Sequence, residues 1–334
     1  MKSRMTTLRA RLGWWWASLI GACSAISTVW AADTDTNAPP AAPAVMTPEQ
    51  TFEGGTNTFN NWIDLAVGGF VVDGTKSQFQ QNQQKSGSAF GGFEDWHYQT
   101  DLAKGTTLST DGRALFDEHD YKVRLDLVKE KTGFVRFSYD QYRTWYNGNG
   151  GFFPPTGTWF PMPDDGLALD RGQVLFEAGL TLDKFPKVTF KYTHDWRDGE
   201  KSSTIWGLTH PGPDVTRGLS PSFYDIDEHS DAFQLDATHH IKATEVGLGL
   251  RYETGKLDDA LKITQFPGEI VQNKVTDRQG TSYDLFNVHA FTETWFKKNL
   301  MLSSGFSYTD LDNDFSGSRI GHAHLLQQQI KFIF

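Results

Sequence analysis

The sequence contains almost no cysteine: Cys23 is the only one among 334 residues. It lies in an apolar segment near the N-terminus. A chain with one cysteine cannot form an intrachain disulfide, so packing and backbone hydrogen bonds must supply its stability.

Long apolar runs are also absent after residue 31, and the mean hydropathy is −0.47. A transmembrane helix needs about 20 mostly apolar residues, so a helical membrane bundle is excluded. A transmembrane β-barrel is not excluded, because its strands need an apolar residue only at every second position.

Basic clusters are missing as well, and the formal net charge is −10. An acidic chain without a basic patch is a poor candidate for binding nucleic acid. No C-x-x-C-H motif occurs, so the chain itself cannot attach c-type haem, and we expect no cofactor.

The N-terminus has the pattern of a secretory signal peptide over residues 1–31. A basic start is followed by the apolar run "LGWWWASLIGACSAISTVW", and small residues precede a cleavage site after Ala31. Cleavage there removes four basic residues and changes the net charge from −10 to −14. An uncleaved anchor helix and a lipoprotein site at Cys23 are the alternatives.

Residues 32–58 are rich in Pro, Ala, Thr and Asp, and we expect them to form a flexible periplasmic lead-in. From residue 59 to residue 334 the sequence changes character. Apolar and polar residues alternate there, which is typical of β-strands.

The stretch "KVTFKYTHDWRD" (187–198) is the clearest example of this alternation. Its odd positions are polar, whereas its even positions are Val188, Phe190, Tyr192, His194 and Trp196. Successive side chains of a strand point to opposite faces, so this strand has one polar and one aromatic face. Similar stretches recur and predict about twelve strands.

The expected connections alternate in length. Short ones fall at "AKGT", "KEKTG", "DKFP", "IKA" and "FKKN", and long ones at 74–90, 147–167, 199–225, 255–282 and 310–322. Only "DEHD" (117–120) breaks the order. Bacterial outer-membrane barrels have tight periplasmic turns and long extracellular loops, so this pattern predicts an all-β, antiparallel, up-and-down transmembrane barrel.

These features, together with the C-terminal "KFIF", resemble Gram-negative outer-membrane β-barrel proteins. The resemblance implies that Phe332 and Phe334 belong to the signal read by the barrel-assembly machinery. It also implies an outer-membrane location, with membrane lipid and that machinery as partners.

The aromatic, Gly-rich strands also resemble the barrel sheath of multihaem electron conduits, the MtrB/PioB family. Members of that family are usually much longer, so the likeness implies a fragment or a reduced relative. TonB-dependent receptors carry an N-terminal plug of well over a hundred residues, and the lead-in here is too short for one.

Charged residues gather on the face that we expect to line the lumen, with eight basic and ten acidic members when Asp64, Asp95 and Glu293 are counted. The near balance of signs predicts weak charge selectivity with a slight preference for cations. The alternative is that these charges pair across strands and fill the interior. The candidate pore-lining residues are Lys122, Arg124, Asp126, Arg136, Asp140, Arg171, Glu177, Lys187, Lys191, Asp195, Arg197, Asp236, Glu245, Arg251 and Glu253.

The loop at 147–166 combines flexible Gly and Asn with stiff Pro and four aromatic residues. Such a loop could form a constriction or bind a partner, and a self-packed surface loop is the alternative. Its candidate residues are Phe152, Phe153, Trp159 and Phe160.

Catalytic and metal sites are not expected. His322 and His324 share a face but have no evident third ligand. Asp225, Asp227, His229 and Asp231 share a face near an outer strand end, as a barrel protease would need, but a solvated acidic strand start is the much simpler explanation.

The sequence therefore predicts a non-enzymatic, porin-like channel for small polar solutes or ions. The alternative is a barrel scaffold that sheathes or docks a periplasmic or surface partner, such as a multihaem cytochrome. The sequence does not identify the solute, the oligomeric state or the partner.

Overall fold

The computed structural model describes residues 61–152, 159–160, 166–212, 215–262, 276–296, 300–315 and 318–333. The chain divides into two units, 1–57 and 58–334, and all described residues belong to the second. The predicted signal peptide (1–31) and lead-in (32–58) therefore lie outside the described residues.

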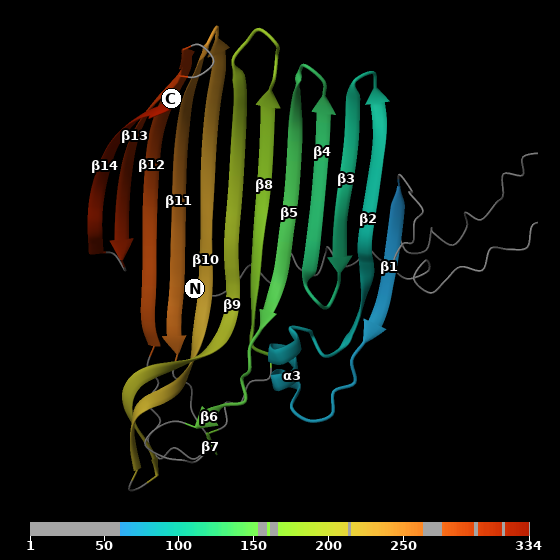
Figure 1. Ribbon diagram of the computed structural model, residues 1–334. Helices are drawn as coiled ribbons and strands as arrows, with labels where there is room; N and C mark the ends of the chain where they lie inside the picture. The colour runs from blue at the N-terminus through green and yellow to red at the C-terminus, as the bar shows by residue number, and fades with distance from the viewer. Residues whose placement is uncertain are drawn as a thin grey trace, which may run out of the picture. The chain divides into compact units, whose positions relative to one another are not determined.

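Twelve antiparallel strands form one sheet in which each strand pairs with its neighbour along the chain (Figure 1). The short strands β6 and β7 form a separate two-stranded sheet, so β5 pairs with β8 in the main sheet. The all-β class, the number of strands and their up-and-down order are confirmed. The strands of the main sheet are β1 (Trp62–Gly69), β2 (Ala89–Ala103), β3 (Thr106–Leu115), β4 (Asp120–Lys129), β5 (Gly133–Trp145), β8 (Ala168–Leu180), β9 (Lys187–Gly212), β10 (Val215–Ile241), β11 (Thr244–Lys262), β12 (Thr276–Phe296), β13 (Leu300–Phe315) and β14 (Ser318–Ile333).

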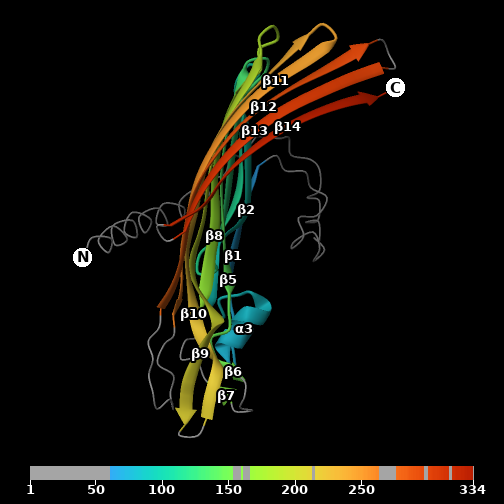
Figure 2. The ribbon, with the colours of Figure 1, turned by 90° about the vertical axis from the view of Figure 1, so that its left-hand side faces the viewer.

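The sheet is a single layer, which Figure 2 shows edge-on. Few apolar side chains are buried in the described part of the chain, and those that are lie near one end of the strands: Leu115, Trp145, Leu167, Leu169, Phe223 and Ile226. A soluble sandwich would bury one face of each sheet against the other. Here large apolar side chains along the strands stay exposed instead.

The strand ladders sort the side chains into two faces. On β9, Phe190 lies opposite Ala178 of β8 and Leu235 of β10, and Leu235 lies opposite Leu250 of β11. The alternate residue Lys191 lies opposite polar residues on both sides. We call these the apolar face and the polar face, and the same parity runs from β4 to β12.

One end of the sheet has tight turns. Two residues separate β2 from β3 and β10 from β11, and three separate β4 from β5. Gly105, Lys131 and Lys242 adopt positive φ of 69°, 55° and 60° in these turns. These positions coincide with three of the short connections expected from the sequence.

The other end differs from the prediction. Segment 199–225 was expected to be a loop, yet β9 continues to Gly212 and β10 begins at Val215. Segment 310–322 was also expected to be a loop, yet only residues 316–317 separate β13 from β14. Part of 255–282 is also strand. The prediction was wrong because it relied on apolar–polar alternation, whereas the backbone hydrogen bonds of a ladder do not depend on that pattern.

The β1–β2 connection forms a helix, α3 (Lys76–Gln83), at the long-connection end. Gln84, which follows it, accepts a hydrogen bond from the Trp145 amide N–H (2.9 Å) and donates one to the Trp145 carbonyl (3.1 Å). The buried Glu118 carboxylate accepts hydrogen bonds from the Ser86 amide and hydroxyl. Side chains thus join three separate connections into one corner.

Glycines opposite aromatic residues recur along the ladders. Phe291 lies between Gly247 on β11 and Gly305 on β13. A Cβ added to Gly247 would lie 2.1 Å from the Phe291 ring, whereas one added to Gly305 would meet nothing within 4 Å. The ring therefore lies over Gly247. Trp196 over Gly172 and Phe134 over Gly179 follow the same arrangement.

Strands β1 and β14 are the edges of the sheet, and no ladder joins them among the described residues. Their order is the one that an up-and-down barrel needs, with the seam between β14 and β1 as its closing step. None of the described helices is both long enough and apolar enough to cross a membrane.

Candidate functional site

The ladders place all fifteen candidate pore-lining residues on the polar face. Asp126 lies opposite Arg136, Arg136 opposite Glu177, and Glu177 opposite Lys191. The remaining members follow by alternation along β4, β5, β8, β9, β10 and β11. The structure therefore brings residues that are far apart in sequence onto one surface. That this surface lines a pore stays a prediction.

Arg136 is the centre of the charged row across β4, β5 and β8. Its Nε lies 3.1 Å from Asp126 Oδ1, and its Nη1 lies 3.3 Å from Glu177 Oε2. Its guanidinium also lies 4.2 Å from the centroid of the Phe134 ring. Two acceptors and a ring hold this side chain against the sheet.

A second group of contacts lies on β11 and β12. Arg251 Nη2 donates to Glu253 Oε2 at 2.6 Å, and Tyr283 Oη donates to Glu253 Oε1 at 2.8 Å. Burial and the bond to Glu253 raise the pKa of Tyr283 to about 12. The phenol therefore stays a donor at neutral pH, and both oxygens of Glu253 are engaged.

Several predicted residues have no polar partner among the described side chains. Unpaired charges keep their full capacity to bind a solute or counter-ion. The residues in this group are Lys122, Arg124, Asp140, Arg171, Lys187, Lys191 and Glu245.

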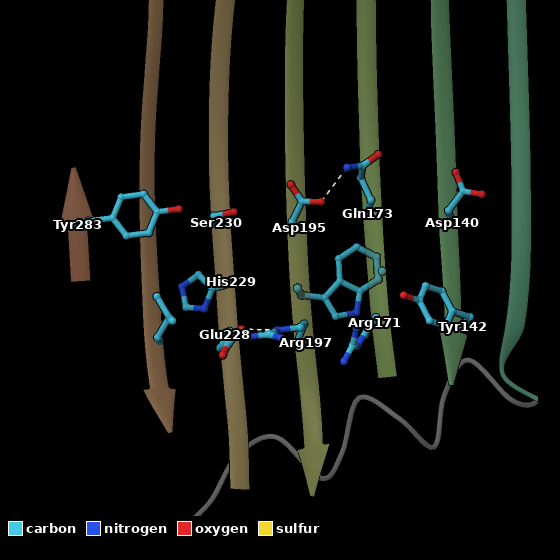
Figure 3. A pocket seen from close by; sticks show the side chains of 13 residues that line it. Asp140, Tyr142, Arg171, Gln173, Asp195, Arg197, Glu228, His229, Ser230 and Tyr283 are labelled. Carbon is cyan, nitrogen blue, oxygen red and sulfur yellow. Dashed lines mark hydrogen bonds and ion pairs between the residues drawn. The ribbon is translucent and has the colours of Figure 1, made fainter. Parts of the chain in front are cut away.

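A hollow of about 630 Å³ lies on the polar face across β5, β8, β9 and β10 (Figure 3). Gln173 Nε2 donates to Asp195 Oδ1 at 2.7 Å on one wall, and Arg197 forms an ion pair with Glu228 on another. Ser230 and Tyr283 contribute hydroxyls. Gly172, Trp196 and His229, from the alternate positions of these strands, also line it.

The apolar face carries a band without ionised side chains. On β11 it contains Thr244, Val246, Leu248, Leu250 and Tyr252, and Leu248 is 52% exposed. The nine residues of β11 from Thr244 to Tyr252, of which these five point to the apolar face, span about 26 Å at ~3.3 Å per residue.

Polar groups begin directly beyond this band, on the side of the long connections. Tyr192 Oη donates to Asp231 Oδ1 at 2.7 Å, and His194 Nδ1 lies 2.8 Å from the same oxygen. Asp284, on the same face, accepts from Tyr252 Oη at 2.8 Å. The hollow lies at the level of these residues, on the opposite face.

Two residues of the protease-like cluster, Asp227 and Asp231, form hydrogen bonds with residues outside that cluster. Asp231 is occupied by Tyr192 and His194, and the amide of Asp227 donates to Asp259 at 3.3 Å. In the described ranges, no group of three or more His, Cys, Asp or Glu residues is arranged to hold a metal.

The loop and the terminal signal are only partly described. Phe152 pairs with Trp159, and Gly151 pairs with Phe160, in the hairpin of β6 (Gly151–Phe152) and β7 (Trp159–Phe160). Phe153 lies outside the described residues. Phe332 lies in β14, where its backbone pairs with Leu302 of β13, and Phe334 is not described.

Sequence reasoning missed the uncharged members of the polar face. Gln173, Ser230 and Tyr283 line the hollow with the predicted charges. Strand parity was the available signal: Gln173 lies two residues from Arg171 and must share its face. Tyr283 directly follows the segment 255–282 that was expected to be a loop, so parity was not applied to it.

No family model and no curated protein sequence matches the chain. Among solved structures, the siderophore receptor PiuA from Acinetobacter baumannii is similar with a TM-score of 0.42 and 10% identity. The match covers 73% of this chain and 44% of that receptor. The chain thus spans less than half of the receptor's length, and a similarity this low carries no functional argument.

Proposed function

We propose that this chain forms an outer-membrane β-barrel channel for passive diffusion of small polar solutes or ions. The observation that carries the proposal is the two-faced single-layer sheet. One face exposes large apolar side chains without a covering layer, and the other carries charges, amides and hydroxyls. Lipid on the first face and water on the second satisfy both.

The length of the apolar band supports the membrane-spanning role. A transmembrane strand needs about 9–11 residues, and the apolar band of outer-membrane barrels is about 25 Å tall. The band on β11 has this length. A soluble protein would rarely leave such a broad apolar surface in water.

Weak selectivity follows from the charges of the polar face. Basic and acidic residues are nearly equal in number, and Arg136, Arg197 and Arg251 each pair with a carboxylate. Paired charges cancel much of each other's field at a distance. The channel should therefore discriminate poorly between small cations and anions.

Single-channel conductance of the refolded full chain in a planar bilayer tests this function. We expect steady ohmic steps, and a salt gradient should give a small reversal potential. A folded, heat-modifiable protein that produces no conductance would contradict the channel. A reversal potential near the Nernst limit would contradict the weak selectivity.

A second candidate is a scaffold that sheathes or docks a protein partner, such as a multihaem cytochrome. It is favoured by one observation: β1 and β14 have no ladder between them in the described part of the chain. Unpaired strand edges recruit further strands. Co-purification of a periplasmic or surface protein with a chain that does not conduct would favour this role.

A further inference from the structure

The hollow on the polar face contains two opposite charges that form no ion pair with a described residue, although Lys122 lies opposite Asp140 and Arg197 lies opposite Arg171. Asp140 and Arg171 both line it, on the adjacent strands β5 and β8. Asp140 lies opposite Gln173, and Arg171 lies opposite Tyr142, so the two charges are diagonal neighbours on one face. They do not form an ion pair with each other.

Arg171 is unusual because its Nε is buried without a hydrogen-bond partner. A buried donor without an acceptor is costly and calls for an explanation, such as a water, ion or ligand that bonds to the guanidinium. No neighbouring carboxylate satisfies it: Glu228 is paired with Arg197, and Asp195 accepts from Gln173. The hollow therefore has one open cationic and one open anionic position.

We propose that the hollow binds a small zwitterion of the amino-acid class, as a solute subsite of the proposed channel. The carboxylate of the solute lies against Arg171, and its ammonium group lies against Asp140. A simple anion would meet Asp140 and Asp195, and a simple cation would meet Arg171 and Arg197. Only a solute that carries both charges complements both Arg171 and Asp140.

The remaining lining suits this occupant. Tyr142, which is 52% exposed, offers a ring for the solute's side chain, and the hydroxyls of Ser230 and Tyr283 offer further polar contacts. The volume of about 630 Å³ admits a free amino acid together with water. The charged ends face each other across adjacent strands, so a small solute can span them.

The test measures binding separately from conduction, because the subsite rests on the proposed channel. Saturation-transfer NMR on the refolded full chain in micelles would use L-alanine as probe, with acetate, methylammonium and glucose for comparison. We expect alanine to bind best. Arg171→Met and Asp140→Asn should each weaken alanine binding by about tenfold or more, since each removes a charge-assisted contact.

Arg113→Met is the control, because Arg113 is a polar-face arginine on β3, opposite Lys122, and does not line the hollow. It should leave alanine binding unchanged, and circular dichroism should show all variants folded. Alanine binding without conductance would support the subsite and overturn the channel.

Conductance without alanine binding would overturn the subsite and leave the channel. Equal binding of glucose or acetate, or alanine binding that both hollow variants leave intact, would also overturn the subsite.

Discussion

Single glycines determine where aromatic rings can lie on this sheet. Phe291 has a glycine opposite it on each side, and its ring covers only Gly247. The arrangement fills the space of a missing side chain with a ring from the next strand. A methyl group is therefore tolerated on one side of Phe291 and excluded on the other.

Gly247→Ala should destabilise the protein by about 1–3 kcal/mol, because its Cβ would meet the ring and force it from its position. Gly305→Ala is the matched control and should have little effect, since its Cβ meets open space. Urea unfolding followed by tryptophan fluorescence measures both. Equal destabilisation by the two substitutions would show that the ring does not lie over Gly247.

Tyr224, which lies beyond the apolar band, should make the stability of the fold depend on pH. Its Oη donates to the buried Asp259 at 2.8 Å, and burial together with this bond raises its pKa to about 12. The folded pKa lies above the ordinary value of 10. The stabilisation is therefore complete below pH 10 and is lost as the pH rises towards 12.

Tyr224→Phe should abolish this part of the alkaline decline. We expect the urea midpoint of the wild type to fall more steeply than that of the variant between pH 10 and pH 12. Tyrosinate absorbance at 295 nm should lose a late-titrating group in the variant. Parallel declines in the two proteins would argue against the raised pKa.

At the level of elements, α3 is attached to the end of β5 by one side chain. Gln84 bonds both backbone groups of Trp145, as an additional strand residue would. The contact lies at the end of the sheet where buried apolar side chains also gather. It links a short polar helix to the sheet without apolar periodicity in the helix.

Gln84→Ala should accelerate amide hydrogen exchange at Trp145 by about tenfold, because two hydrogen bonds of about 1 kcal/mol or less each are lost. Gln83→Ala is the control, since Gln83 is exposed and makes no such bond. Global unfolding should change little in either variant. Unchanged exchange at Trp145 in Gln84→Ala would contradict the attachment.

The sequence allowed the strands to be predicted where one face is apolar, as for Val188–Tyr192. It also allowed the tight turns and the parity of all fifteen polar-face charges to be predicted. It could not reveal the extension of β9 to Gly212 or the start of β10 at Val215, because these segments lack a regular apolar–polar alternation and backbone pairing does not require one. The helix α3 was missed because "KSQFQQNQ" contains a single large apolar residue.

At the scale of the whole molecule, the proposed function depends most on one assignment: the apolar face contacts lipid, and the polar face contacts water. Leu248 and Thr189 lie at neighbouring depths, and by parity they point to the apolar and the polar face. An arginine at the lipid-facing midplane costs about 2–4 kcal/mol, whereas a lumen position tolerates it.

Leu248→Arg should therefore reduce the stability of the vesicle-inserted protein by about 2–4 kcal/mol, and Thr189→Arg by much less. Guanidinium titration of the protein folded into lipid vesicles measures both. The reverse ranking would mean that the polar face meets lipid and would overturn the proposed orientation. Equal effects would argue against a membrane-spanning sheet.

The two edge strands differ in length, since β1 has 8 residues and β14 has 16. A ladder between β1 and β14 can therefore contain at most 8 residue pairs. By comparison, 16 pairs join β12 to β13. The β1–β2 ladder also has eight pairs, so the two sides of β1 would be the weakest lines of the sheet under mechanical load. Pulled apart across its circumference, the molecule would separate first beside β1, where about half as many residue pairs resist as between β12 and β13.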